Sequence, residues 1–351
     1  MGGSGTEAVR GGTRAYIGSF TSGGGRGVLA ADVDEETGAL TVTGASDAVP
    51  DPSFLALAGP VLHAVSETRD GAVAAFDVTG PVPLPLGSPV PVGGAAPTHL
   101  ALAGGHLLTA NYTSGSVTAL PLAEDGTARA AAAVLTHEGS GPVADRQRGP
   151  HAHQVLPDPS GRWVVSVDLG TDSVRICALD PVSGALTLHG ETRLRPGTGP
   201  RHLAFHPAGT HAYVLNELEP TLTVCRWDAA DGVLEPLGET AVVPEGAAGP
   251  SYPSEVVVAP DGRFLWVAVR GDDTLAVLAL DADGASAALA TTVPCGGTWP
   301  RDLALAPSGR HLYAANERSG DVTWFTLDPE SGVPARAGSV EAPAASCVVF
   351  G

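Results

Sequence analysis

Apolar and polar residues alternate in short runs along the chain, and the runs recur in blocks of about fifty residues. The clearest blocks begin at Gly199, Tyr252 and Trp299. Each has a proline, an alternating run, a Pro-x-Gly sequence, a second run that ends in polar residues, and a third run that ends near Asp and Gly. Alternation with a period of two is typical of β-strands, and Pro-x-Gly favours tight turns. The pattern therefore predicts an all-β protein built from short strands.

The number of blocks predicts the architecture. The prolines that open the blocks are 43 to 53 residues apart, at Pro52, Pro97, Pro150, Pro200, Pro253, Pro300 and, less clearly, Pro343. The segment from residue 13 has the later strands of a block without the first, and the C-terminal AASCVVFG has a first strand alone. Repeats of this length with four strands are typical of a radial arrangement. We expect a seven-bladed β-propeller of four-stranded antiparallel blades, closed when the C-terminal strand joins the N-terminal blade.

Composition limits the domain organisation and the location of the protein. Residues 13–351 are expected to form a single propeller domain, whereas residues 1–12 have few apolar side chains and are expected to form a disordered tail. No stretch is apolar enough to span a membrane, and the N-terminus lacks the apolar region of a secretory signal. The four cysteines are scattered without a metal-binding spacing. We therefore expect a cytoplasmic protein with free thiols.

The charge of the chain excludes several classes of partner. There are 38 acidic and 19 basic residues, a net charge of −19, and no lysine. An acidic surface repels nucleic acid and anionic membranes, so neither is an expected partner. Because a closed ring leaves no sheet edge free, we expect a monomer. The basic residues are all arginines, whose planar guanidinium groups suit carboxylates and phosphates, so an anionic small molecule would need a local cluster of them.

The repeat also predicts which side chains meet. In each blade the innermost and second strands are antiparallel, so the start of the first and the end of the second lie on the same face. Alignment on the Pro-x-Gly turn therefore predicts a ring of charged and polar side chains at one mouth of the central channel. The ring contains His153, Arg201, Glu217, Arg270, Arg301, Glu317, Glu67 and Asp168, with Tyr112 at an equivalent strand end. The alternative is that these charges pair with one another and serve only the structure.

Several segments resemble the lactonase family of seven-bladed propellers, which includes the propeller-type 6-phosphogluconolactonase and is related to a fungal carboxymuconate cyclase. They are YIGSFTSGGGRGV, NYTSGSV, DRQRGPHAHQV, GTGPRHLAFHP and LNELEPTLTV. The resemblance implies an active site at the channel mouth. It implies that the catalytic residues are His153 of PHAH, Arg201 of GPRH, Glu217 of NEL and Arg270 at a later strand end. Arg146 and Gln147 match the RQ element of the family.

These residue types suit the hydrolysis of a lactone, an activated ester. The reaction needs a base to activate water and a cation to stabilise the developing oxyanion. Either His153 or Glu217 could be the base, and the sequence leaves this choice open. Arg201 and Arg270 are expected to bind the substrate anion and the oxyanion. The expected substrate-binding residues are Arg146, Gln147, Arg301, Glu317, Tyr112 and His151.

The sequence favours a small anionic sugar lactone as substrate and leaves two other functions open. One is a muconate-type cycloisomerase that uses the same Glu and Arg groups, and the other is a propeller that serves only as an interaction platform. His151 and His153 face the same side of a strand, as a metal pair would, but no third ligand is evident. We therefore expect no metal and no cofactor.

Overall fold

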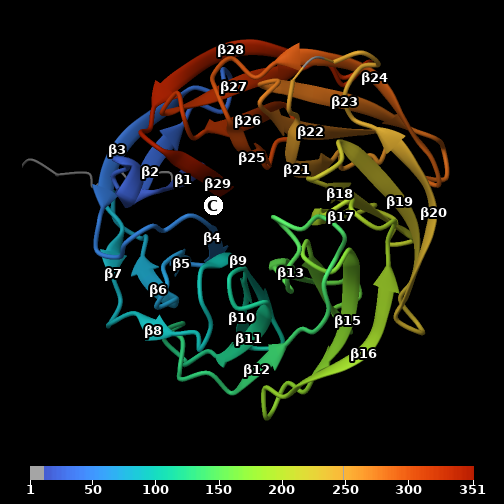
Figure 1. Ribbon diagram of the computed structural model, residues 1–351. Helices are drawn as coiled ribbons and strands as arrows, with labels where there is room; N and C mark the ends of the chain where they lie inside the picture. The colour runs from blue at the N-terminus through green and yellow to red at the C-terminus, as the bar shows by residue number, and fades with distance from the viewer. Residues whose placement is uncertain (1–11, 248) are drawn as a thin grey trace, which may run out of the picture.

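The computed structural model describes residues 12–247 and 249–351. Within these residues the chain forms seven antiparallel sheets arranged radially around a central channel (Figure 1). The predicted all-β, seven-bladed architecture is thus confirmed, and the helical structure of the described residues is one 3-10 turn, η1 (Thr21–Gly23). The predicted disordered tail lies outside the described residues except for Gly12.

We number the blades 1 to 7 in chain order and give the strands of each from the channel outwards. Blade 1 contains β29 (Ala345–Phe350), β1 (Arg14–Ser19), β2 (Val28–Val33) and β3 (Leu40–Ser46). Blade 2 contains β4 (Leu55–Ala58), β5 (Val61–Ser66), β6 (Ala72–Asp77) and the short outer strands β7 (Leu84–Pro85) and β8 (Val90–Pro91). Blade 3 contains β9 (Pro97–Ala103), β10 (His106–Asn111), β11 (Ser116–Pro121) and β12 (Ala133–Thr136).

The remaining four blades follow the same order. Blade 4 contains β13 (Ala152–Pro157), β14 (Val164–Asp168), β15 (Ser173–Leu179) and β16 (Leu186–Arg193). Blade 5 contains β17 (Pro200–Phe205), β18 (His211–Asn216), β19 (Thr221–Asp228) and β20 (Val233–Ala241). Blade 6 contains β21 (Tyr252–Val258), β22 (Phe264–Arg270), β23 (Thr274–Leu280) and β24 (Ala287–Pro294). Blade 7 contains β25 (Pro300–Leu305), β26 (His311–Asn316), β27 (Asp321–Leu327) and β28 (Pro334–Glu341).

The ring closes between the two ends of the chain, as predicted. β29 is the innermost strand of blade 1 and pairs antiparallel with β1, with Tyr16 opposite Val349. Arg14 and Gly351 exchange both backbone hydrogen bonds, at 2.8 and 2.9 Å. In Figure 1 the C-terminal strand accordingly lies at the channel, inside the N-terminal strands. The closing sheet removes the free edges that an open array of blades would expose.

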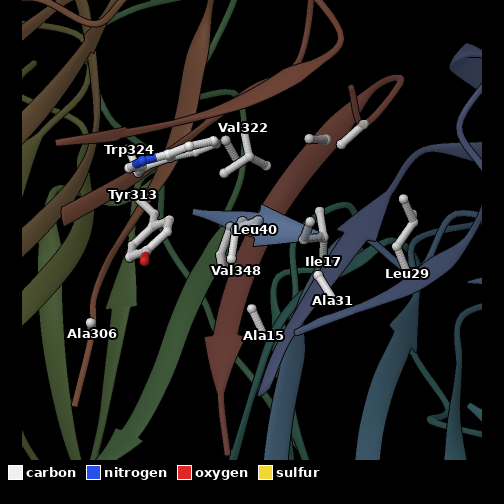
Figure 2. Packing of buried hydrophobic residues seen from close by; sticks show 13 residues of the cluster. Ala15, Ile17, Leu29, Ala31, Leu40, Ala306, Tyr313, Val322, Trp324 and Val348 are labelled. Atoms are coloured by element: carbon white, nitrogen blue, oxygen red, sulfur yellow. The ribbon is translucent and has the colours of Figure 1, made fainter. Parts of the chain in front are cut away.

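Apolar side chains fill the space between neighbouring blades. Where blade 7 meets blade 1, Tyr313 and Trp324 pack with Ile17, Leu40 and Val348 (Figure 2). The second strand of each blade is almost continuously buried, the third is buried along half or more of its length, and the outermost strand is mostly exposed or partly buried. Because each sheet buries both faces against its neighbours, the seven cores make a rigid frame for the channel.

Hydrogen bonds from second strands also tie one blade to the next. Tyr213 donates its hydroxyl to the carbonyl of Gly284 at 2.9 Å, and Tyr313 donates to that of Gly38 at 2.7 Å. Gly38 has a φ of +75°, and a Cβ there would lie 2.7 Å from the ring of His311. Only glycine allows this turn to approach the neighbouring blade so closely.

Candidate active site

A β-bulge at the start of the inner strand re-aims one residue in at least five of the blades. The pairing of the inner strand with its neighbour skips Arg201 in blade 5, Arg301 in blade 7 and His153 in blade 4. It also skips Thr98 in blade 3 and Ser346 in blade 1. A bulge leaves the extra residue outside the ladder and turns its side chain. The register thus gives these residues equivalent places at the channel mouth, where the alignment of the repeats predicted His153, Arg201 and Arg301.

A second backbone feature fixes the residues at the ends of the second strands. Glu217 donates its N–H to the carbonyl of Gly199 at 2.8 Å, and Glu317 donates to that of Trp299 at 3.1 Å. The same bond recurs in blades 2, 3 and 4, from Glu67, Tyr112 and Leu169. Gly199 and Trp299 both have positive φ, 59° and 66°, and each precedes the proline that opens an inner strand. The turn before the proline therefore holds the end of one strand beside the start of another.

Three guanidinium groups converge on the carboxylate of Glu217. Arg146 Nη2 lies 2.6 Å from Glu217 Oε1, while Arg270 Nη2 and Arg201 Nε lie 2.8 and 3.3 Å from Oε2. The side chains of Glu217, Arg201 and Arg270 are at most 7% exposed, and that of Arg146 is 36% exposed. Arg201 also donates through Nη1 to the carbonyl of Ser254. The structure thus brings together four predicted site residues from blades 5 and 6 and from the loop before blade 4.

The electrostatics of this cluster favour the negative charge of Glu217, while burial disfavours the positive charges of Arg201 and Arg270. Burial alone would raise the pKa of Glu217, but Arg270, Arg201 and Arg146 outweigh it and lower that pKa to about 2. Burial and the neighbouring Arg270 lower the pKa of Arg201 to about 9, which leaves it cationic at neutral pH. Glu217 is therefore a firmly ionised carboxylate that holds three cations in place.

A second charged cluster lies on the other side of the ring. Arg301 contacts Glu317 at 3.3 Å and Glu67 at 3.8 Å, and its guanidinium carbon lies 4.9 Å from the centre of the Phe20 ring. Ser53 donates a hydrogen bond to Glu67. Charged side chains of the ring therefore pair with one another, as expected from the alternative in which these charges serve only the structure. Within the two clusters, four guanidinium groups nevertheless face three carboxylates, so positive groups outnumber negative ones by one.

His153 is a buried, neutral imidazole near both clusters. Its residue is 5% exposed, and its Nδ1 is buried without a hydrogen-bond partner. Burial, followed by repulsion from Arg201 and His202, lowers the pKa of His153 well below its usual value. The ring of Tyr112 meets it edge-on at 5.5 Å between centroids. His153 is therefore unprotonated at neutral pH, which is the form in which an imidazole can act as a base.

Tyr112 links His153 to the Glu217 cluster. Arg146 Nη2 lies 3.4 Å from the hydroxyl of Tyr112 and 2.6 Å from Glu217. His151 stacks on the other side of Tyr112 at 4.4 Å and hydrogen-bonds through Nδ1 to the Tyr112 carbonyl at 2.9 Å. Both predicted substrate-binding residues thus lie at the mouth, with His151 holding the ring of Tyr112 in place.

Gln147 holds the loop that carries Arg146. The Gln147 residue is completely buried, and its amide nitrogen donates to Asp172 at 2.7 Å and to the Leu169 carbonyl at 2.8 Å. Its amide oxygen accepts from the N–H of Val143 at 3.0 Å. All the polar atoms of the Gln147 side chain are hydrogen-bonded within the protein, and the side chain points into the loop rather than towards the ring. The position of Gln147 in the sequence, next to Arg146, did not reveal this orientation.

We expect Gln147→Ala to weaken substrate binding through Arg146. The loss of a buried amide would leave the carboxylate of Asp172 and the Val143 N–H without their partner, which lowers the free energy of unfolding by about 1–3 kcal/mol. A displaced Arg146 should raise KM for the lactone by about tenfold with a smaller change in kcat. Chemical denaturation and steady-state kinetics measure both effects. Arg148→Ala is the matched control, because Arg148 lies in the same loop with its side chain 80% exposed, and should change neither.

Asp168 does not belong to the ring, contrary to the sequence prediction. Its carboxylate accepts hydrogen bonds from the backbone N–H of His151, Gly170 and Thr171. It also contacts His137 Nδ1 at 2.6 Å and Arg175 at 3.2 Å. By register Asp168 is equivalent to Asn216, the last residue of β18, and not to Glu217, which follows it. Asp168 therefore anchors the loop before β13 from within the blade.

Sequence reasoning missed a layer of buried polar side chains immediately below the mouth. They lie one residue after the bulge position, and they are His99, His202, Glu255 and Asp302, which are 2% to 8% exposed. The rings of His99 and His202 lie 5.5 Å apart, although they come from blades 3 and 5. The sequence did contain a signal for this layer. A polar residue recurs two positions after the opening proline in inner strands that are otherwise apolar.

The described residues, 12–247 and 249–351, contain no group of three or more His, Cys, Asp or Glu side chains arranged to hold a metal ion. His151 and His153 do not act as a pair, because His151 stacks on Tyr112 and bonds to its carbonyl, whereas the rings of His153 and Tyr112 meet edge to face. The donor set at the mouth is thus dominated by guanidinium groups, which repel cations.

Known proteins share both the fold and the length of the chain. Residues 14–350 match the family model described as lactonase, 7-bladed beta-propeller. The chain is 32% identical over 342 residues to the 6-phosphogluconolactonase of Bacillus subtilis, covering 95% of this chain and 97% of that protein. A solved structure from Bacteroides fragilis is 28% identical, with a TM-score of 0.90 over all of both chains. The periplasmic gluconolactonase of Pseudomonas aeruginosa is 28% identical, with a TM-score of 0.88 over 96% of this chain and 98% of that one. The chain therefore belongs to the lactonase family of seven-bladed β-propellers.

Proposed function

We propose that this protein is a lactone hydrolase of the 6-phosphogluconolactonase type, which converts 6-phosphogluconolactone to 6-phosphogluconate. The observation that carries the proposal is the convergence of Arg146, Arg201 and Arg270 on Glu217, close to the neutral imidazole of His153. The similarity to the Bacillus subtilis 6-phosphogluconolactonase over nearly the whole chain supports the same assignment. In this proposal the reaction takes place at the channel mouth.

The electrostatics favour His153 over Glu217 as the base. A carboxylate with a pKa of about 2 that is already bound by three guanidinium groups is a weak proton acceptor. The imidazole of His153 is unprotonated at neutral pH and can take a proton from water as the water attacks the lactone carbonyl. The proton later passes to the ring oxygen that leaves. Glu217 is then the group that orients the arginines.

The arginines supply the positive charge that the reaction needs. Attack on the carbonyl carbon places negative charge on the carbonyl oxygen, and a guanidinium held in place stabilises that charge without reorganising. Arg201 and Arg270 are nearly fully buried and suit this role, whereas the more exposed Arg146 and Arg301 suit the phosphate or carboxylate of the substrate. Tyr112 and the Trp299 ring, 5.5 Å from the Arg270 guanidinium, would border the sugar.

Hydrolysis of three fresh lactones tests the proposal. We expect turnover of 6-phosphogluconolactone well above that of unphosphorylated gluconolactone, and little turnover of a muconolactone. A preference for the muconolactone would favour the cycloisomerase, and activity on none of them would favour an interaction platform. Each assay needs subtraction of the spontaneous rate, because lactones hydrolyse in water without an enzyme.

We further propose that the enzyme acts as a monomer in the cytoplasm and needs neither metal nor nucleic acid. The four cysteines, Cys177, Cys225, Cys295 and Cys347, are buried free thiols, which suits a reducing compartment. No helix in the described part of the chain has the length and apolar character to cross a membrane. Gel filtration and activity in the presence of a chelator test the oligomeric state and the independence from metal.

A further inference from the structure

Two acidic side chains meet in the layer below the channel mouth. Glu255 of β21 and Asp302 of β25 are both buried, and their carboxyl groups lie close enough together to affect each other's pKa. Asp302 Oδ2 also accepts from the N–H of Val348 at 2.8 Å, and Glu255 Oε1 accepts from that of Val256 at 3.0 Å. Two ionised carboxylates buried side by side repel each other, so one of them keeps a proton. The pair therefore shares one proton and carries a single negative charge.

His202 connects this carboxyl pair to His153. His202 Nδ1 lies 2.7 Å from Glu255 Oε2, so it donates its proton to that carboxylate and its Nε2 is the free acceptor. The rings of His202 and His153 lie 5.1 Å apart at 69°. His202 Nε2 and His153 Nδ1 are both buried without a partner. Buried polar atoms are nearly always hydrogen-bonded, so each of these nitrogens lacks its usual partner, as does Nδ1 of the neighbouring His99.

We propose that His202, Glu255 and Asp302 form a proton relay behind His153, in which the carboxyl pair stores the proton that His153 removes from the attacking water. This proposal rests on the proposed lactone hydrolysis and adds three residues to it. His202, Glu255 and Asp302 do not touch the substrate, so they are positioning residues that act through His153.

The relay conserves protons at each step. His153 takes the proton of water on Nε2 as the water oxygen bonds to the lactone carbonyl carbon. The two nitrogens are not hydrogen-bonded at rest, so the Nδ1 proton of His153 passes to His202 Nε2 through a bridging water or after the two rings turn towards each other. The Nδ1 proton of His202 then passes to Glu255 Oε2. Both imidazoles end neutral, and the carboxyl pair changes from one proton to two. The reverse sequence returns the proton to the ring oxygen of the lactone when the carbon–oxygen bond breaks.

The surroundings of the pair suit a group that gains and loses a proton near neutral pH. Burial, opposed by Arg201, raises the pKa of Glu255 to about 7, and burial together with Glu255 raises that of Asp302 well above its usual value. The other titratable groups that face the relay come from every strand around it. They are His99 on β9, His153 on β13, Arg201 on β17, Glu217 after β18, Arg270 on β22, Arg301 on β25 and Cys347 on β29.

Glu255→Gln and Asp302→Asn test the relay, because each keeps the shape of the side chain and removes the shared proton. We expect each to lower kcat by about 10- to 100-fold with little change in KM. The profile of kcat against pH, measured between about pH 5 and 8, should contain a titration near neutral pH in the wild type that both variants lack. Unchanged kcat and an unchanged profile in both variants would overturn the relay.

Asp158→Asn is the matched control, since Asp158 is 3% exposed and accepts hydrogen bonds from Ser160 and from the N–H of Trp163 at the end of blade 4 away from the channel mouth. This variant should lower stability and leave the pH profile of kcat unchanged. A loss of kcat as large as in Glu255→Gln would mean that the relay variants act by disturbing the structure.

Infrared spectroscopy at neutral pH gives a readout of the shared proton without substrate. We expect a band of a protonated buried carboxyl in the wild type and its loss in Glu255→Gln. Absence of the band would refute the shared proton. A band without lactone turnover would instead refute the proposed function, and the catalytic role of the relay with it.

Discussion

His153→Ala is expected to lower kcat/KM for lactone hydrolysis by about 10²–10⁴-fold while the protein stays folded. The imidazole lies near the arginine cluster, is buried and neutral, and makes no hydrogen bond through Nδ1. Without it, water must attack the lactone unassisted, although the arginines still bind the anion. The loss should therefore fall on kcat, with KM changed little. Stopped-flow or pH-stat kinetics with subtraction of the spontaneous rate would measure it.

Two further measurements separate lost chemistry from lost structure. His106 is also a buried histidine, 3% exposed, but it begins β10 at the end of the blade away from the channel mouth. His106→Ala should therefore reduce stability and leave kcat within about a factor of two. Added imidazole should restore part of the activity of His153→Ala, because it can enter the space left by the ring. Full activity in His153→Ala would remove His153 as the base and return that role to Glu217.

The repeat predicts the fold and much of the site because the blades are nearly equivalent. Alignment on the Pro-x-Gly turn is enough to place Arg201 and Arg301 in the same position of blades 5 and 7, where the register of both strands puts them. It also places Glu217 and Glu317 together, since the backbone bond before the proline recurs. Such positions depend on local backbone geometry, which short sequence patterns encode well.

The sequence fails where a contact depends on a segment outside the repeat. Asp168 turns away from the channel because His137 and Arg175 offer it a buried partner, and His137 comes from the long loop before β13. Gln147 lies in that loop and is used to hold it. The alignment stopped at the bulge, so it missed His202 one residue further, where contacts across the channel decide the direction of the side chain. The partners in these contacts are not separated by a constant number of residues, so an alignment of the repeats cannot predict them.

Glu217→Gln should destabilise the protein by about 3–5 kcal/mol, because it leaves three guanidinium groups together without their common carboxylate. We also expect kcat/KM to fall by about 10²-fold, since Arg146 and Arg201 lose the partner that orients them. Urea denaturation and steady-state kinetics would measure the two effects. Glu317→Gln is the matched control, because Glu317 occupies the equivalent position of blade 7, is 27% exposed and, among residues 12–247 and 249–351, forms one ion pair, with Arg301. Its loss should change stability by about 0–1 kcal/mol.

The pH dependence of this difference tests its electrostatic origin. The pKa of Glu217 is about 2 in the folded protein and 4.5 ordinarily, so the folded state favours the ionised form. A lowered pKa stabilises the fold fully above the ordinary value, and the stabilisation is lost as the pH falls towards the folded pKa. The shift corresponds to about 3 kcal/mol. The stability difference between wild type and Glu217→Gln should therefore be constant from about pH 7 to 5 and shrink below about pH 4.5. A protonated glutamate carries the same charge as glutamine, so a difference that persists at low pH would mean that shape, and not charge, makes Glu217 important.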